Sequence, residues 1–233
     1  DGNGIDIAIH PKDKKWIPEM IFMHLRTSTN YDDEEKKLVG GKNGFGIKLV
    51  FIFAEWGIVE TVDHVRKLKY TQRVEKNLSL IHKPTIEKYS GKPYTKVTWF
   101  PDYKRFGLKG MTDDIWNHLQ KRAYDIAGVT NKSMKVKLQD EIIPIKSFEQ
   151  YVDMYIGEKE VSKRLYQNNE RWECVIALSP LDEFAQVSFV NGINTGKGGK
   201  HVDYLSKLII ASIKEHIKKK HKKDIMDNYV KNY

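Results

Sequence analysis

The sequence contains a single cysteine, Cys174, and no long apolar run. One cysteine excludes a disulfide within the chain and suits a reducing compartment. The longest apolar stretch, residues 49–54, is far shorter than the roughly 20 residues that a membrane-spanning helix needs. There is also no signal-peptide pattern, internal repeat or low-complexity linker. These absences exclude a disulfide-stapled domain, and we expect no contact with a membrane.

What the sequence does have is an ordinary globular composition with an excess of positive charge. Its 233 residues allow one large domain or two small ones. Hydrophobic residues make up 40% of the chain, charged residues make up 30%, and the formal net charge is +9. This charge favours a polyanionic partner without specifying which one.

Hydrophobic periodicity divides the chain into strands and helices. Strands are predicted within residues 5–9, 57–80, 94–101, 171–179 and 185–193, with the last two as strands of one sheet. Helices are predicted within residues 14–27, 112–128, 148–157 and 199–223. Thr112 or Asp113 is expected to cap the second helix, and Gly128 to end it. A second unit is expected to begin near Ile145, so the predicted domains are residues 1–145 and 146–233.

Residues 40–49 read GGKNGFGIKL, with four glycines directly before an apolar run. One interpretation is a flexible turn. The other is an anion site, where backbone N–H groups converge on a phosphate that glycine allows to come close. A Walker A loop does not fit because Ile47 follows Gly46, and Leu49 stands where a dinucleotide fingerprint has its third glycine. By length alone, residues 47–57 are either a buried strand or a buried helix.

Six segments resemble, in the same order, the ATPase region of eukaryotic-type (type IIA) DNA topoisomerase II. They read TSTNYDDEEKKLVGGKNGFGIKL, VTWFPD, KRAYDIAG, QYVDMY, RWECVIALS and VSFVNGINTGKGGKHVDY. Their order and their coverage of nearly the whole chain make the resemblance specific. It implies an α/β (α+β) fold, in which a GHKL-type ATPase sandwich of a mixed sheet and helices is followed by the first part of a transducer domain.

The resemblance implies an ATP site in the first domain. DGNGI at residues 1–5 resembles the glycine box that closes the adenine pocket, and Asp1 stands at the position that accepts a hydrogen bond from the adenine amino group. Asn is common there in the family, and the side-chain oxygen of either residue can accept this bond. Ser28, Thr29 and Asn30 resemble the Ser-Ser-Asn that contacts ribose and phosphate.

Residues 41–48 resemble the ATP lid, whose backbone amides wrap the triphosphate. The expected contacts are Gly41, Lys42, Asn43, Gly44, Phe45, Gly46, Ile47 and Lys48. Lys42, Phe45 and Ile47 stand where the family frequently has Arg, Tyr and Ala, and the missing guanidinium and tyrosine hydroxyl would weaken nucleotide contacts. If the lid faces a phosphate, the apolar run after it is a helix, because the amino end of a helix attracts anions.

Other parts of the family's active site have no match in this sequence. The water-activating glutamate and the asparagine that holds magnesium would precede Asp1, and the Gln-Thr-Lys loop would follow Tyr233. We therefore expect a fragment with no catalytic residue and no turnover of its own. ATP and Mg²⁺ are the expected cofactors. No metal ligand is predicted, because the eight histidines lack metal-site spacing and the acidic run at residues 32–35 is typical of a solvated loop.

A basic cluster lies near the end of the sequence and comprises Lys218, Lys219, Lys220, Lys222 and Lys223. One interpretation is a solvated helix end, where lysines meet the negative end of the helix dipole. Five lysines within six residues instead favour a phosphate-binding patch. Such a patch would contact duplex DNA without reading its sequence.

Together, these expectations describe the ATP-gate region of a type IIA DNA topoisomerase. The complete enzyme would be a homodimer in which ATP binding closes a gate around duplex DNA and hydrolysis helps to reset it. The alternative is a GHKL-type nucleotide-dependent clamp or chaperone-like module without strand passage. The expected location is the nucleus for a cellular protein, and the host cytoplasm or virion for a protein of a large DNA virus.

Overall fold

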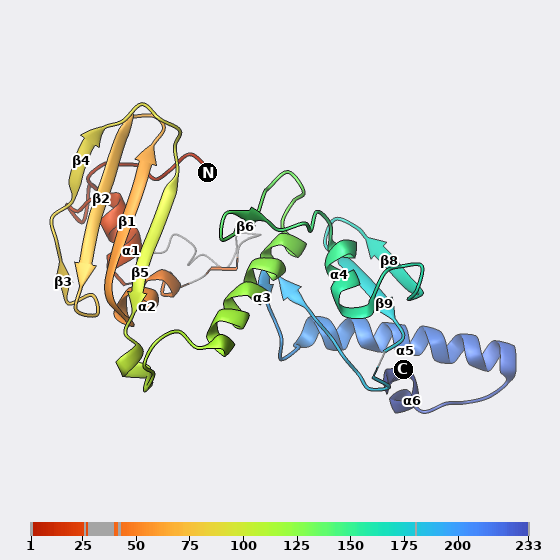
Figure 1. The fold of residues 1–233 in the computed structure, drawn as a ribbon. Coiled ribbons are helices and arrows are strands. Elements are labelled where there is room, and N and C mark those ends of the chain that lie inside the picture. Colours follow the sequence, from red (N-terminus) through yellow and green to blue (C-terminus); the bar gives the residue numbers. More distant parts are fainter. Residues whose placement is uncertain (1, 26, 28–39, 42, 180, 233) are drawn as a thin grey trace. The chain divides into compact units, whose positions relative to one another are not determined.

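The structure, a computed structural model, describes residues 2–25, 27, 40–41, 43–179 and 181–232 (Figure 1). The chain forms two compact units. The first comprises Asp1–Lys37 and Gly41–Met111, and the second comprises Leu38–Gly40 and Thr112–Tyr233. The predicted domain boundary between residues 145 and 146 concerns the domains of the family and stays a prediction.

A five-stranded sheet forms the framework of the first unit. Its central strand, β1 (Ala54–Asp63), pairs with β2 (Leu68–Glu75) on one side and β5 (Thr95–Pro101) on the other. The short strands β3 (Leu80–Ile81) and β4 (Thr85–Lys88) both pair with β2. Every pairing among these described strands is antiparallel, and short turns can connect consecutive antiparallel strands.

Two short helices, α1 (Ile17–Met23) and α2 (Gly46–Ile52), pack on this sheet. Pro18 lies in the first turn of α1, where its missing N–H removes no helical hydrogen bond. The buried core cluster draws on both helices and two strands and consists of Phe22, Met23, Phe51, Val59 and Val74. A 3₁₀ turn, η1 (Tyr103–Phe106), follows β5.

The second unit contains two helices that are joined by a buried polar cluster. The carboxylate of Asp125, on α3 (Asp113–Val129), accepts a hydrogen bond of 2.6 Å from the hydroxyl of Tyr151, on α4 (Phe148–Ile156). Lys121 Nζ and Arg122 NH1 each donate to the same carboxylate at 2.9 Å. Burial alone would raise the pKa of Asp125, but these donors outweigh it and lower the pKa. The charged carboxylate therefore ties α3 to α4 with its partners in place.

Three hairpins and two further helices complete the described part of the second unit. The hairpins pair β6 (Lys137–Leu138) with β7 (Glu141–Ile142), β8 (Arg164–Asn168) with β9 (Glu173–Ala177), and β10 (Phe189–Val190) with β11 (Ile193–Asn194). Arg164 forms an ion pair with Asp153 at 2.5 Å, which attaches the β8–β9 hairpin to α4. The helices are α5 (Lys200–His221) and α6 (Asp227–Asn232).

Most of the predicted elements are confirmed, including all four helices and the strands now numbered β1, β2, β5 and β9. Thr112 caps α3, because its hydroxyl oxygen accepts a hydrogen bond of 3.3 Å from the N–H of Ile115. The ambiguous apolar run over residues 47–57 divides into most of α2 and the start of β1. The helix expected directly after the glycines is therefore present.

Three local predictions are wrong. Residues 5–9 do not form a strand, because the N–H groups of Ile5 and Ile7 bond to side chains of β1 and not to a neighbouring backbone. The segments around β9 and β10 are not neighbours in one sheet, since each pairs within its own hairpin. Gly128 does not end α3, which continues to Val129. A β-carbon at Gly128 would lie 2.5 Å from Tyr151 Cγ, so this glycine permits close packing of α4.

We predict that Gly57→Ala destabilises the first unit. A β-carbon at Gly57 would lie 2.4 Å from Cε1 of Phe51, which is fully buried. Because Phe51 has no free space to move into, this overpacking should lower the free energy of unfolding by about 1–3 kcal/mol. Denaturant unfolding measures the change, with Gly110→Ala as the control because a β-carbon there meets nothing within 4 Å. Equal stability of the two variants would contradict the prediction.

Candidate functional site

The glycine turn near the start of the chain is attached to the end of β1. Gly4 has φ +72°, and a β-carbon there would lie 1.7 Å from the carbonyl oxygen of Val62, so this approach requires glycine. The N–H of Ile5 donates to Thr61 Oγ1 at 3.0 Å, and the carbonyl oxygen of Asn3 accepts from the N–H of His64 at 3.2 Å. The turn is thereby fixed by both backbone and side-chain contacts.

Asp63 at the end of β1 holds the same segment by its carboxylate, which is almost completely buried. It accepts from the backbone N–H groups of Ile7 at 3.0 Å, Val65 at 2.8 Å and Arg66 at 3.0 Å, and from the Arg66 guanidinium at 2.8 Å. Burial alone would raise the pKa of Asp63, but these hydrogen bonds outweigh it and hold the pKa well below its usual range. Asp63 is therefore a charged anchor for the turn.

The glycine-rich segment before α2 has one position that needs glycine for its backbone. Gly44 has φ +65°, in the left-handed region that side chains with a β-carbon disfavour. Phe45 is the residue before the helix and provides no side-chain cap, and α2 begins at Gly46. A β-carbon at Gly41 or Gly46 would meet nothing within 4 Å, so nothing in the described protein explains glycine at these two positions.

Lys48, in the first turns of α2, is a buried cation. The residue is 3% exposed, and burial lowers the pKa of its ammonium group. Its Nζ donates to the hydroxyl oxygen of Thr27 at 3.1 Å, and no described carboxylate forms an ion pair with it. A desolvated ammonium next to a neutral acceptor is poorly compensated, and an anion would supply the missing opposite charge. This pairing fits a phosphate group.

Solved structures of topoisomerase II match almost the whole chain. The crystal structure of the ATPase region of Saccharomyces cerevisiae topoisomerase II matches 99% of this chain and 60% of its own, with a TM-score of 0.91 and 44% identity. The chain is homologous to the ATPase region of DNA topoisomerase II. The ATPase and transducer domains of topoisomerase II from Balamuthia mandrillaris match 100% of this chain and 60% of their own, with a TM-score of 0.92 and 36% identity. The α/β fold class of this region is confirmed.

The sequence relatives of this chain are much longer proteins. A probable DNA topoisomerase 2 from Dictyostelium discoideum is 44% identical over 238 residues, and DNA topoisomerase 2 from Saccharomyces cerevisiae is 42% identical over 250 residues. Both alignments use the whole of this chain, which spans only 16% and 17% of the two relatives. The family model described as DNA gyrase B matches residues 145–232.

The structure describes part of the ATP site that the resemblance to topoisomerase II implies. Gly41 and residues 43–48 lie in or before the first turns of α2. The other expected contacts lie outside the described residues: Asp1, Ser28, Thr29, Asn30 and Lys42. Thr27 and Asp63 were not predicted as site residues. No spacing rule would find Asp63, since its partner Ile7 is 56 residues away, whereas Thr27 directly precedes the expected Ser28.

The basic cluster of this chain lies at the end of α5. Lys218, Lys219 and Lys220 occupy its last turn, and Lys222 follows with φ +54°. Consecutive positions on a helix point about 100° apart, so these lysines surround the helix end and do not line one face. All five are exposed, and two have acidic neighbours: Lys218 pairs with Asp224 at 3.1 Å and Lys219 with Glu215 at 2.6 Å.

Two kinds of feature are not found in the part of the chain that the structure describes. No group of three His, Cys, Asp or Glu side chains is arranged to hold a metal ion, and we assign Mg²⁺ to no residue of this chain. None of the described helices has the length and apolar character needed to cross a membrane.

We predict that Asp63→Asn destabilises the first unit in a pH-dependent way. Losing the charged acceptor should lower the free energy of unfolding by about 1–3 kcal/mol at pH 7. Because the folded-state pKa is depressed, the stabilisation by Asp63 is fully present above the unfolded-state pKa of about 4 and is lost as the pH falls through the folded value. The stability difference from wild type, measured by denaturant unfolding, should therefore shrink between pH 5 and pH 3. A difference that stays constant with pH would contradict this role.

Proposed function

We propose that this chain is the nucleotide-binding part of the ATP gate of a type IIA DNA topoisomerase. The observation that carries the proposal is the buried ammonium of Lys48, whose partner among the described residues is the neutral Thr27 hydroxyl, in a chain that matches the ATPase region of a topoisomerase II over 99% of its length. When bound, ATP supplies a triphosphate anion, and the charge of Lys48 would hold it. The backbone of Gly44 would place the lid over the phosphates, because its left-handed conformation turns the chain into α2.

The same proposal assigns the adenine end of the nucleotide to the glycine turn on β1. Asp63 and Thr61 fix the backbone of residues 3–7 in the folded protein. A turn held in this way is ordered before the ligand arrives, which reduces the entropy cost of binding. Asp1, Ser28, Thr29 and Asn30 would complete the contacts with adenine, ribose and phosphate, by the resemblance to the family. No residue of this chain is assigned to water activation or to Mg²⁺.

For the whole protein, we propose ATP-dependent passage of duplex DNA by a homodimer, with the second unit coupling the nucleotide site to the gate. The names of the relatives support a DNA topoisomerase activity. Their eukaryotic sources support a nuclear location if the protein is cellular. The alternative, a GHKL clamp without strand passage, is disfavoured because the similarity includes the transducer segments as well as the lid.

We predict that Lys48→Met weakens nucleotide binding without weakening the fold. Removing a charged contact to phosphate should raise the dissociation constant of adenylyl imidodiphosphate, a non-hydrolysable ATP analogue, about 10- to 100-fold. The free energy of unfolding should stay equal or rise, because a poorly compensated buried charge is removed. Titration calorimetry on the full-length protein measures binding, with the exposed Lys83→Met as the control. Unchanged affinity in Lys48→Met would exclude Lys48 from the site.

We also predict that the basic cluster at the end of α5 binds duplex DNA without sequence preference. The test variant replaces Lys218, Lys219, Lys220, Lys222 and Lys223 with alanine. Binding should weaken equally for unrelated sequences, and the slope of log affinity against log salt should become shallower by up to about 0.9 for each phosphate that is no longer neutralised. Fluorescence anisotropy at several salt concentrations measures both effects. An unchanged salt slope would mean that the lysines are a solvated helix end.

A further inference from the structure

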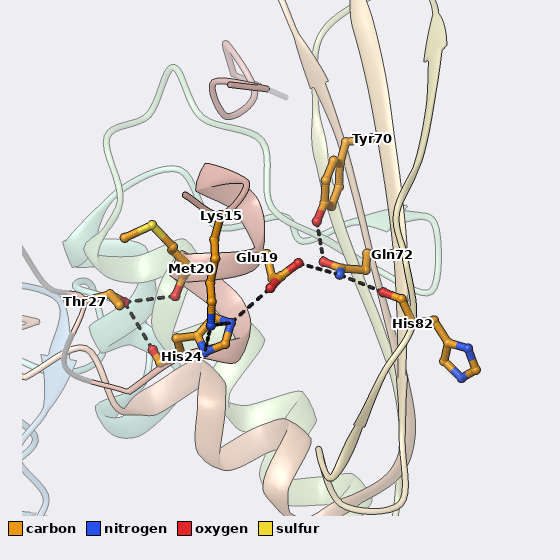
Figure 2. A network of polar contacts seen from close by, with 8 residues as sticks. All are labelled: Lys15, Glu19, Met20, His24, Thr27, Tyr70, Gln72 and His82. Carbon is orange, nitrogen blue, oxygen red and sulfur yellow. Dashed lines mark hydrogen bonds and ion pairs between the residues drawn. The ribbon is translucent and has the colours of Figure 1, made fainter. Parts of the chain in front are cut away.

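The hydroxyl group of Thr27 lies between the end of α1 and the ammonium of Lys48. Its Oγ1 accepts a hydrogen bond from Lys48 Nζ at 3.1 Å. The same oxygen lies 3.0 Å from the carbonyl oxygen of Met20 and 3.2 Å from that of His24, and it donates its single proton to these acceptors (Figure 2). The last carbonyls of a helix lack partners within the helix. Thr27 therefore satisfies the end of α1 and presents a lone pair to Lys48 at the same time.

Helix α1 is itself attached to the sheet through Glu19. One carboxylate oxygen of Glu19 accepts from Gln72 Nε2 at 3.0 Å, and the other lies 3.1 Å from His24 Nε2 (Figure 2). Gln72 is buried on β2, where it also donates to the carbonyl oxygen of His82 at 2.8 Å and accepts from the hydroxyl of Tyr70. The carbonyl groups that orient Thr27 are thus held by a network that begins in the core of the sheet.

The charges around this network are nearly balanced. Lys15 Nζ lies 3.1 Å from His24 Nε2, so a lysine and a carboxylate both face the His24 ring. In contrast, the Lys48 ammonium meets the uncharged Thr27 hydroxyl. Among the described residues, Lys48 therefore has no negatively charged partner in this network, and its positive charge can pair with an anionic ligand. The position of its ammonium group depends on the Thr27 hydroxyl oxygen, which accepts a hydrogen bond from it.

We propose that Thr27 is a positioning residue for the nucleotide phosphates, which holds the Lys48 ammonium in its binding position before the ligand arrives. This inference rests on the proposed nucleotide function of Lys48. A flexible lysine loses side-chain entropy when a ligand immobilises it. Thr27 removes part of this cost in advance. It also stabilises the protonated form, because its oxygen accepts from the ammonium.

The test compares Thr27→Val, which keeps the shape and removes the hydroxyl, with Thr27→Ser, which keeps the hydroxyl. In the full-length protein, Thr27→Val should raise the dissociation constant of adenylyl imidodiphosphate about 10-fold, the effect of one hydrogen bond to a charged group. Thr27→Ser should bind about as tightly as the wild type. Thr71→Val on β2 is the matched control, because Thr71 lies outside the network. If Thr27→Val does not fold, Thr27→Ala takes its place.

A second measurement does not depend on nucleotide binding. The pKa of Lys48, followed by the NMR shift of its side-chain carbon Cε, should fall in Thr27→Val and be restored in Thr27→Ser. A residue that only stabilised α1 would leave this pKa unchanged.

The outcomes separate this inference from the proposed function. Loss of analogue binding in Lys48→Met together with wild-type binding in Thr27→Val would overturn the role of Thr27 and leave the proposed function in place. If the wild type does not bind the analogue, the proposed function fails. In that case, an unchanged Lys48 pKa in Thr27→Val would overturn the hydrogen bond itself. Equally weakened binding in Thr27→Ser and Thr27→Val would also contradict the inference, because the hydroxyl would not matter.

Discussion

The first unit depends on strand β1, because both the sheet and the N-terminal segment are attached to it. Its backbone pairs with β2 and β5, and its buried face contributes Val59 to the core. Its last residues use their side chains differently, since Thr61 and Asp63 bind the N–H groups of the glycine turn. Strand β1 is thus the centre of the sheet, contributes to the core and supports the proposed adenine end of the site.

The proposed site contains two buried charges that differ in how well the described protein compensates them. Asp63 is buried together with four donors, so its charge is satisfied within the protein. Lys48 is buried with a neutral hydroxyl as its described partner. Burial of a charge with little compensation costs folding free energy, and a ligand of opposite charge recovers that cost on binding. The difference between the two residues is the reason why we propose Asp63 as an anchor and Lys48 as a contact for an anion.

In the second unit, a buried carboxylate joins two helices. Asp125 is as buried as Asp63, but its donors come from the side chains of α3 and α4 and not from a loop backbone. Close packing at Gly128 brings Tyr151 within reach of this carboxylate. By contrast, α5 has no buried residue, and the lysines at its basic end are exposed. The unit therefore has a rigid attachment between α3 and α4 and an exposed charged helix.

Local sequence patterns predicted helices α1, α3, α4 and α5, the long strands and the resemblance to topoisomerase II. Amphipathic spacing is local information, and the cap at Thr112 and the proline in α1 follow from their neighbours in the chain. The folded protein was needed to identify the pairing of the hairpins, the role of Gly128 and the partners of Asp63 and Lys48. Among these contacts, Lys48–Thr27, Tyr151–Asp125 and Ile7–Asp63 join residues that are 21, 26 and 56 positions apart. The spacing of residues carries no record of such pairings, because packing brings these groups together only after the local elements have formed.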